Sequence, residues 1–378
     1  MHYLCETSVS IEFLVEILER QTGQKLQLES FSAKRIGVGE GFLSAVVLVT
    51  FKWKRPTEHE APEKVVFKSP QVSGASGSLS RELETWLPSA HHCEAALYEM
   101  FKSIPNLCLP KIYYTRPVSA EQNGLIVMQY LEGAPANGVQ GLALNQVYSA
   151  TGALAKLHAA AFQMKTDWQS SFIVKAEEWK PILSGWAAEP MLKLRPFQPE
   201  FCHRVLTRFV EWFDADTAFQ LMNHSHEQLG IPAVPVHGDL WNPNFFWEEK
   251  GGRAMDKIVA VIDWQLAHPG CLTEDLGCML ASSVPGDLRR SHTDKILDFY
   301  YEQLCSFMDG TAPFTLSQLK NAYKVTLPIG MMLMVFSLPF WLEHSSMQGE
   351  NRDKLYPVIM KRAEDIIDDV LGLYRSNY

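Results

Sequence analysis

The sequence predicts an α+β protein in which a small, strand-rich N-terminal part precedes a larger, mostly helical C-terminal part. Two observations lead to this fold class. Up to about residue 130, short β-branched runs alternate with turns that contain glycine, as in an antiparallel sheet. Beyond Gly133 the chain becomes Ala-rich, and apolar residues recur at helical spacing over several long segments. We expect the character to change near residues 132–140, so that 1–132 and 133–378 form two lobes of one unit.

The N-terminal part is expected to begin with a helix and to continue as a sheet. Apolar residues at helical spacing predict helices over 8–22 and 91–102. The Ser- and Gly-rich stretch 69–80 predicts a mobile loop. The predicted strands are two within 31–53 around a glycine turn, followed by 64–68, 112–115 and 124–130.

The C-terminal part is expected to be dominated by helices. Two short β-branched pieces, 234–236 and 258–262, predict the strands that remain there. The predicted helices cover 145–163, 201–222, 290–308, 316–327 and 353–373.

Composition narrows the class of protein. Hydrophobic residues make up 47% of the 378 residues, which is enough for a sizeable core and argues against disorder. The net charge of −9 argues against nucleic-acid binding, which needs a basic surface. The seven cysteines include no Cys-x-x-Cys pair, so neither a zinc site nor a disulfide framework is indicated. We expect reduced thiols in a cytoplasmic protein.

Two segments bear on targeting and on membranes. The first 20 residues contain acidic side chains and lack a basic region followed by an apolar one, so no secretory signal is expected. Residues 325–342 form an uncharged segment, and this segment is long enough for a membrane-spanning helix. Pro328, Gly330 and Pro339 interrupt this segment, and no basic cluster flanks it. We therefore expect a buried core helix and no membrane span.

The segment from His237 to Asn244, His-Gly-Asp-Leu-Trp-Asn-Pro-Asn, contains candidate catalytic residues. Phosphoryl transfer to a hydroxyl needs a carboxylate that orients the hydroxyl and accepts its proton, and a nearby amide oxygen that ligates Mg²⁺. Asp239 and Asn244 have the spacing that lets both side chains leave one short loop and reach the same phosphate. An ordinary turn, rich in Asp, Asn, Gly and Pro, is the alternative for this segment alone.

Asp263 strengthens the interpretation as a phosphoryl-transfer site. It follows the apolar run Ile258–Ile262, and a carboxylate at the end of such a strand suits a second magnesium ligand. The residues after it are Trp264 and Gln265, which depart from the Asp-Phe-Gly of protein kinases. A simple strand-terminating aspartate is the alternative.

Weaker indications of a nucleotide-binding site lie in the N-terminal part. Gly37, Gly39 and Gly41, followed by Ser44, form a turn whose backbone N–H groups can approach phosphate closely. A lysine is disfavoured in an apolar strand unless its amine has a partner, and Lys68 lies in such a strand. An edge-strand lysine facing water is the alternative. Glu94 or Glu99 on the following helix would supply an ion-pair partner.

Taken together, the motifs resemble the CHK kinase-like family, which includes the ecdysteroid kinase-like proteins and is related to choline kinases and aminoglycoside phosphotransferases. The resemblance rests on His237–Asn244, on Ile262–Gln265 and on Glu94 four residues before Tyr98. Trp241 and Gln265 are typical of this branch. The resemblance extends from the glycine turn to the helices after residue 275 and implies a protein-kinase-like two-lobed fold.

The resemblance also implies a role for each candidate residue, with ATP and Mg²⁺ as cofactors. Asp239 would be the catalytic base, and Asn244 and Asp263 the magnesium ligands. Lys68 would pair with Glu94. His237 and Asp275 would support the catalytic loop. The nucleotide-binding residues would be Gly37, Gly39, Gly41 and Ser44, together with the hinge Met128–Leu131, whose Gln129 and Leu131 would meet adenine.

We therefore expect an ATP-dependent kinase that phosphorylates a hydroxyl of a small-molecule acceptor. A catalytically weak pseudokinase or a nucleotide-binding module is the alternative. A protein kinase is disfavoured, because Asp275 follows Asp263 too soon for a long activation segment. His158 and the tryptophans between the hinge and the loop (Trp168, Trp179, Trp186 and Trp212) are expected in the core. A wall of the acceptor site, which the resemblance places in this region, is the alternative for the tryptophans. The sequence leaves the acceptor, the oligomeric state and the role of 69–93 open.

Overall fold

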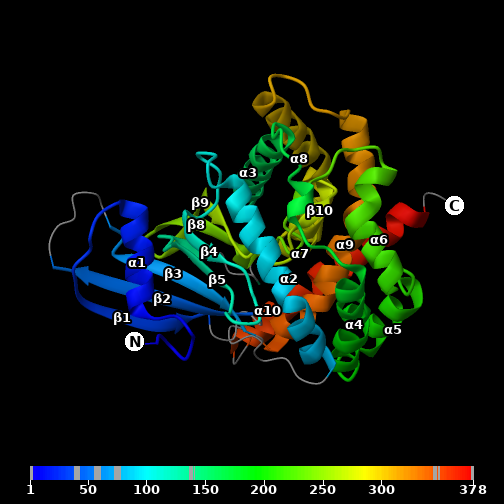
Figure 1. The fold of residues 1–378 in the computed structure, drawn as a ribbon. Coiled ribbons are helices and arrows are strands. Elements are labelled where there is room, and N and C mark those ends of the chain that lie inside the picture. The colour runs from blue at the N-terminus through cyan, green and yellow to red at the C-terminus, as the bar shows by residue number, and fades with distance from the viewer. Residues whose placement is uncertain are drawn as a thin grey trace. The chain divides into compact units, whose positions relative to one another are not determined.

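The computed structural model describes residues 3–37, 43–54, 61–71, 78–135, 139, 141–343, 347 and 350–375. The chain divides into two compact units. Unit 1 comprises Met1–Pro105 and Leu109–Glu132, and unit 2 comprises Asn106–Cys108 and Gly133–Tyr378. In Figure 1, unit 1 runs from blue to teal and unit 2 from green to red.

The described part of unit 1 combines a five-stranded antiparallel sheet with helices. The sheet has the strand order β1-β2-β3-β5-β4. Its elements are α1 (Ile11–Thr22), β1 (Leu28–Ile36), β2 (Ser44–Trp53), β3 (Lys64–Pro70), α2 (Ser78–Phe101), β4 (Ile112–Arg116) and β5 (Leu125–Gln129).

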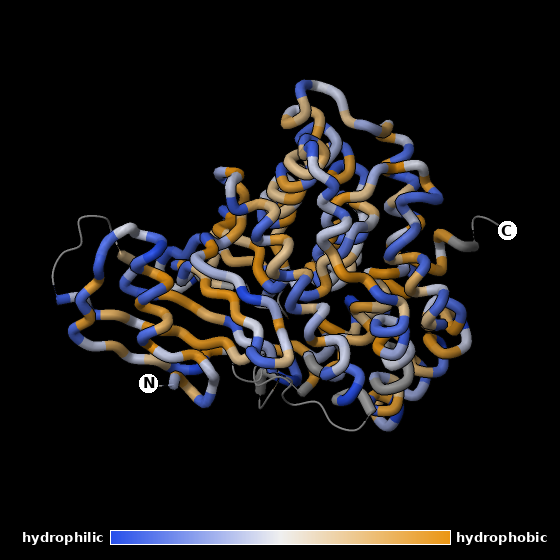
Figure 2. The backbone as a smooth tube through the Cα atoms, viewed as in Figure 1, coloured by the Kyte–Doolittle hydropathy of each residue, from blue (hydrophilic) through white to orange (hydrophobic). Residues whose placement is uncertain are grey.

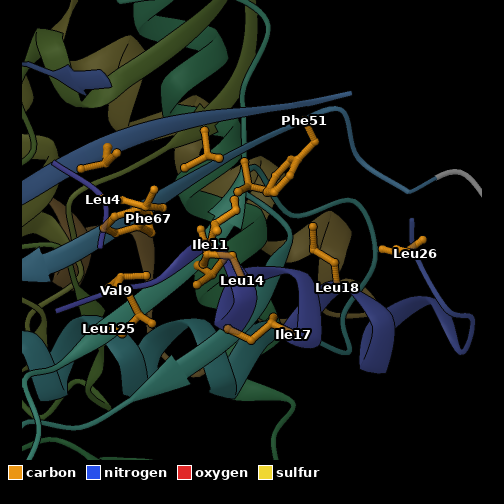
Figure 3. Packing of buried hydrophobic residues seen from close by; sticks show 14 of the residues in the cluster. Leu4, Val9, Ile11, Leu14, Ile17, Leu18, Leu26, Phe51, Phe67 and Leu125 are labelled. Atoms are coloured by element: carbon orange, nitrogen blue, oxygen red, sulfur yellow. The ribbon is translucent and has the colours of Figure 1, made fainter. Parts of the chain in front are cut away.

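Helix α1 covers one face of this sheet. Ser10 caps its first turn by accepting a hydrogen bond from the Phe13 amide, and Gly23 ends it in a left-handed conformation with φ of 69°. The buried face of α1 packs on alternate residues of β2, β3 and β5, which all point to that face of the sheet (Figure 3). The cluster includes Leu14, Leu18, Val47, Val49, Phe51, Val65, Phe67, Leu125 and Val127. Figure 2 shows the hydrophobic stretches along these strands.

The described part of unit 2 is mostly helical. Its helices are α3 (Leu144–Phe162), η1 (Gln169–Ser171), α4 (Ala176–Leu194), α5 (Pro199–Arg208), α6 (Ala215–Gln228), η2 (Asn242–Asn244), α7 (Thr273–Ser283), α8 (Gly286–Phe307), α9 (Leu316–Glu343) and α10 (Glu350–Arg375). All residues of α7 are buried, and the helix packs closely against α9.

Two small antiparallel sheets lie within unit 2. Strand β7 (Val234–Val236) pairs with β10 (His268–Gly270), so that Val236 is the register partner of His268. The other sheet has the order β6-β8-β9 and contains β6 (Ala134–Pro135), β8 (Phe245–Lys250) and β9 (Arg253–Val261). The segment between β7 and β8 is the predicted catalytic loop, so both sheets anchor it.

The apolar segment 325–342 lies within helix α9. Its stretch Leu316–Pro339 is long and apolar enough to cross a membrane, but 72% of the 18-residue window is buried inside the structure. Pro328 and Pro339 lie inside the helix. Such burial is what we expected of a core helix.

The predicted α+β architecture is confirmed, and several helix boundaries were wrong. The predicted helix 201–222 is two helices, because the Asp214 side chain caps a new helix by accepting from the Thr217 amide at 2.9 Å. The helix expected over 91–102 begins at Ser78, within the predicted loop 69–80, of which residues 72–77 lie outside the described ranges. The helix expected over 316–327 extends to Glu343. Helix α4 was not predicted.

Candidate active site

Lys68 and Glu94 form a buried ion pair in unit 1. Phe67 points into the α1 core, so the next side chain, Lys68, lies on the other face of the sheet. There the Lys68 Nζ atom donates to Glu94 Oε1 and Oε2 at 2.9 and 2.8 Å. Glu94 is fully buried and Lys68 is 8% exposed. A pair desolvated to this degree holds its lysine in one position.

The choice between Glu94 and Glu99 follows from the helix geometry. The Tyr98 hydroxyl, one turn away from Glu94, donates to Glu94 Oε1 at 3.3 Å. Glu99 lies elsewhere on α2, where it pairs with Lys102 and accepts from the Thr115 hydroxyl at 3.0 Å. The ion pair anticipated between Lys68 and Glu94 is therefore present, and its role toward phosphate stays a prediction.

The other predicted nucleotide-binding residues of unit 1 are only partly described. Gly37 has φ of +64°, a conformation that suits glycine, and Ser44 opens strand β2. Gly39 and Gly41 lie outside the described residues. Gln129 ends β5, where its amide donates to the Lys111 carbonyl at 2.8 Å, and Leu131 follows. The assignment of these residues to ATP stays a prediction.

In unit 2, Asp275 holds the start of the predicted catalytic loop. Its carboxylate accepts from the His237 amide at 2.8 Å and from the Gly238 amide at 3.1 Å. Gly238 has φ of +80°, and a Cβ atom there would lie 2.7 Å from the Leu266 carbonyl oxygen. Only glycine therefore fits this position without strain. Two amides bonded to one carboxylate fix the loop where it leaves β7.

The His237 ring ties this loop to the end of β9. Its Nδ1 atom accepts from the Asp239 amide at 3.2 Å. Its Nε2 atom donates to the Ile262 carbonyl at 2.8 Å, and the ring packs against Trp264. Because Ile262 directly precedes Asp263, one imidazole binds next to both the predicted base, Asp239, and the predicted magnesium ligand, Asp263.

Asn244 closes the loop from its other end. Its side-chain Nδ2 donates to the Asp239 carbonyl at 2.8 Å, which orients the amide oxygen Oδ1 away from that carbonyl. The Asn244 carbonyl accepts from the Ile262 amide at 3.0 Å. Between these residues, the Asn242 amide donates to the Ser283 hydroxyl at 3.0 Å. The loop is thus bonded to Ile262, which directly follows β9, and to both ends of α7.

The electrostatics of the loop favour a cation. Asp239 is half-buried, and burial together with the charge of Asp263 raises the pKa of Asp239 to about 8. Asp263 adopts a left-handed backbone with φ of +67°, which is uncommon for a residue other than glycine. Two carboxylates that repel each other in a small space are the setting that a divalent cation neutralises.

The donor set fits magnesium completed by phosphate. In the part of the chain that the structure describes, no cluster of three or more His, Cys, Asp or Glu side chains is placed to hold a metal ion alone. Asn244 and Asp263 would contribute hard oxygen ligands, and Mg²⁺ usually takes one or two protein ligands plus substrate phosphates and waters. These residues stay predicted ligands.

Sequence reasoning missed one support of this loop and a buried pair close to it. Ser283 binds the Asn242 amide, and nothing in the local sequence around Ser283 indicates that contact. His268 and Glu274 lie buried beneath the loop, 3.5 Å apart. Glu274 could have been identified as a candidate from the sequence, because it directly precedes Asp275, which was predicted to support the loop. Trp168 and Trp179 are buried, as expected for core residues, whereas Trp212 is half-buried and the expectation of a core position was wrong for it. The side chain of Trp186 lies outside the described part of the structure.

Comparison with known sequences gives a family and two relatives. The family model DUF1679, described as "Uncharacterized oxidoreductase dhs-27", matches residues 3–378. The Caenorhabditis elegans protein described as uncharacterized oxidoreductase dhs-27 is 26% identical over 282 residues, which cover 70% of this chain and 34% of that protein. The uncharacterized kinase-like protein D1044.1 of the same organism is 25% identical over 293 residues, which cover 73% of this chain and 75% of that protein. The chain thus matches about a third of the first relative's length.

A solved structure shows the same fold. The crystal structure of choline kinase from Cryptosporidium parvum Iowa II aligns with a TM-score of 0.55 at 13% identity, covering 97% of this chain and 99% of that chain. Together with the kinase-like relative, this likeness confirms the resemblance to a kinase-like family related to choline kinases. At this identity it shows the fold alone.

Proposed function

Since the chain belongs to the DUF1679 family and has the fold of a choline kinase, we propose that it is an ATP-dependent kinase that phosphorylates a hydroxyl group of a small molecule. The observation that carries this proposal is the loop from His237 to Asn244. Its proposed base, Asp239, is held by His237 and Asn244, and Asp275 fixes the residues before it. An ordinary turn has no need of such bracing.

Each residue of the loop has a proposed role. The Asp239 carboxylate would accept a hydrogen bond from the acceptor hydroxyl, orient it and take its proton. Asn244 Oδ1 and the Asp263 carboxylate would hold Mg²⁺, which would neutralise charge on the transferring phosphoryl group. In unit 1, the Lys68 ammonium, fixed by Glu94, would bind ATP phosphates.

The word oxidoreductase in the family description does not suit this chain. A nicotinamide-binding domain of the common type is a parallel sheet with helices on both faces. Every strand pairing in the described part of this chain is antiparallel. The relative that bears this name is a longer protein, of which the chain matches 34%.

The decisive experiment replaces Asp239. Purified protein is incubated with Mg·ATP and a metabolite extract, and mass spectrometry detects products heavier by one phosphoryl group. With the acceptor found, we expect Asp239→Asn to lower kcat by a factor of about 10² to 10⁴, because general-base catalysis contributes that much. Asp256→Asn is the matched control, since Asp256 is an exposed aspartate of β9.

Two outcomes would decide against the proposal. Full turnover in a folded Asp239→Asn protein would show that Asp239 is not the base. If the parent protein binds Mg·ATP in a thermal-shift titration but phosphorylates nothing in the extract, the chain is a nucleotide-binding module. Circular dichroism establishes that each variant is folded.

A further inference from the structure

Beneath the catalytic loop, His268 and Glu274 form a fully buried pair. His268 is in β10 and Glu274 is in the first turn of α7, and both have 0% exposure. His268 Nε2 lies 3.5 Å from Glu274 Oε2. Neither that nitrogen nor either Glu274 oxygen has another hydrogen-bond partner in the described residues. The Trp179 ring packs edge-to-face on the imidazole, with ring centroids 5.4 Å apart, and helps exclude water.

The hydrogen bonds of His268 require a proton between the two side chains. Its Nδ1 atom lies 2.8 Å from the Leu266 carbonyl oxygen, and a carbonyl only accepts, so Nδ1 carries a hydrogen. Nε2 then has a lone pair in the neutral ring, and that lone pair would face a carboxylate oxygen. One proton on Nε2 or on Glu274 removes this repulsion. Burial raises the pKa of Glu274. Burial alone would lower the pKa of His268, but the charge and hydrogen bond of Glu274, together with the Leu266 carbonyl and the charge of Asp275, raise it overall.

The pair lies next to the groups that hold the catalytic loop. Val236, the register partner of His268, directly precedes His237. Glu274 directly precedes Asp275, whose carboxylate binds the His237 and Gly238 amides. Two adjacent buried carboxylates repel each other unless one is neutralised. The other titratable groups near the pair are His226 on α6 and the thiols of Cys271 and Cys278.

We propose that His268 is a positioning residue. It neutralises Glu274, so that Asp275 stays ionised and continues to bind the His237 and Gly238 amides of the catalytic loop. An ionised carboxylate binds amides more strongly than a neutral carboxyl group. Without His268, only a proton on Glu274 can remove the charge of Glu274, and at high pH both Glu274 and Asp275 are ionised. Their repulsion then moves Asp275 away from the two amides that it binds. The loop should then loosen, and more so at high pH, where no proton is available to replace the histidine.

Hydrogen exchange of the loop tests the proposal without any assay of activity. The measurement is exchange of peptides covering 236–240, at pH 6.5 and pH 8.0, relative to the parent at the same pH. In His268→Gln we expect exchange about tenfold faster at pH 8.0 and a smaller effect at pH 6.5, the size expected when a charge-assisted hydrogen bond is weakened. Glu274→Gln removes the competing carboxylate, so it should exchange like the parent. His268→Gln/Glu274→Gln should restore the parent rate.

Several results would overturn the proposal. The first is exchange in His268→Gln that equals the parent rate at both pH values. The second is exchange in the double variant that is as fast as in His268→Gln. The third is faster exchange than the parent in Glu274→Gln. If His268→Gln does not fold, Glu274→Gln and the double variant still decide. His158→Gln is the control, because His158 is buried in the same unit and binds Tyr300 instead of a carboxylate.

The kinetic consequence rests on the proposed function. We expect kcat of His268→Gln to fall about tenfold at pH 8.0, in step with the loss of loop protection, while KM for ATP changes less than about twofold. An unchanged kcat in a variant with a loosened loop would overturn the catalytic role. If the parent transfers no phosphoryl group, the proposed function fails, and the exchange measurement still tests the positioning role.

Discussion

Three histidines of unit 2, each with 0% exposure, make three different kinds of contact. His237 accepts from Asp239 and donates to Ile262, so it positions the loop. His268 faces a carboxylate. His158 has only a neutral partner among the described residues, since its Nδ1 atom bonds the Tyr300 hydroxyl at 2.7 Å and its Nε2 atom has none there. The partner determines whether a buried imidazole retains its charge.

His158 predicts a specific loss of stability in acid. Burial lowers the pKa of His158 from 6.5 to about 3. Below pH 6.5 the unfolded chain therefore binds a proton that the folded chain does not, and the free energy of unfolding falls by up to about 1.4 kcal/mol per pH unit. Between pH 7 and pH 5, His158 should cost the parent about 2 kcal/mol, a loss that His158→Gln should not share.

Urea denaturation of both proteins at pH 7 and pH 5 measures this difference. His91, whose pKa burial lowers to about 4, acts in the same direction in parent and variant, so it cancels in the comparison. His203→Gln, which changes an exposed histidine of α5, should keep the full pH dependence of the parent. Equal pH dependence in the parent and His158→Gln would contradict the prediction.

At the scale of single residues, the sequence predicts which residues are candidates for the site better than it predicts which contacts they make. Helical spacing placed Glu94 and Glu99 on one helix, but spacing could not select between them, and only the family resemblance favoured Glu94. The structure selects Glu94, because its carboxylate binds Lys68 on the face of the sheet opposite α1. The contact between Asn242 and Ser283 joins residues 41 apart, and no local pattern predicts it.

Among the secondary-structure elements, α7 connects most of the site. Its first turn supplies Asp275 to one end of the catalytic loop, and its last residue, Ser283, supplies a hydroxyl to the other end. Its middle is held by a close approach to α9, where a Cβ atom at Gly330 would lie 2.6 Å from the Gly277 carbonyl oxygen. The spacing of α7 from α9 therefore depends on a glycine.

Gly330→Ala should destabilise unit 2. The added methyl group would collide with backbone atoms of Gly277, which cannot move without shifting α7, so we expect a loss of about 3 kcal/mol, the upper range for overpacking. Gly152→Ala is the matched control in the middle of α3, where the nearest atoms lie 3.8 and 3.9 Å away on the Phe299 ring. It should gain up to about 1 kcal/mol from helix propensity. Urea denaturation measures both, and a neutral Gly330→Ala would contradict this account of the α7–α9 contact.

Periodicity predicted the type of most elements, and boundaries failed where side chains or tertiary packing decide them. Asp214 starts α6 through a cap that an apolar pattern does not reveal. Helix α9 continues beyond residue 327 although Pro328 and Pro339 argue against a helix, because burial on several sides stabilises it. Helix α4 contains Pro181 and Pro190, which obscured its helical pattern.

On the scale of the whole molecule, the last helix ties together distant parts of unit 2. Helix α10 contacts α7, α8 and α9. The buried guanidinium of Arg362 donates to the Ser282 carbonyl at 2.7 Å and to the Val139 carbonyl at 2.8 Å, which are 80 and 223 residues away in sequence. The sequence predicted a helix here but none of these contacts, since no local signal encodes pairings over such distances.

The ion pair between Arg289 and Asp369 should be the most stabilising charge contact of α10. Arg289 is 1% exposed, and its Nε and Nη2 atoms donate to Asp369 Oδ2 at 2.8 and 2.6 Å. Asp369→Asn would leave a buried guanidinium without its carboxylate, which typically costs about 3 kcal/mol or more. The neighbouring Asp368 pairs with Arg204 at 3.3 Å, where both side chains are well exposed. Asp368→Asn should therefore cost less than about 1 kcal/mol. Urea denaturation at neutral pH measures the loss of stability in each variant. Equal losses would contradict the prediction that the buried ion pair of Asp369 stabilises unit 2 more than the exposed ion pair of Asp368.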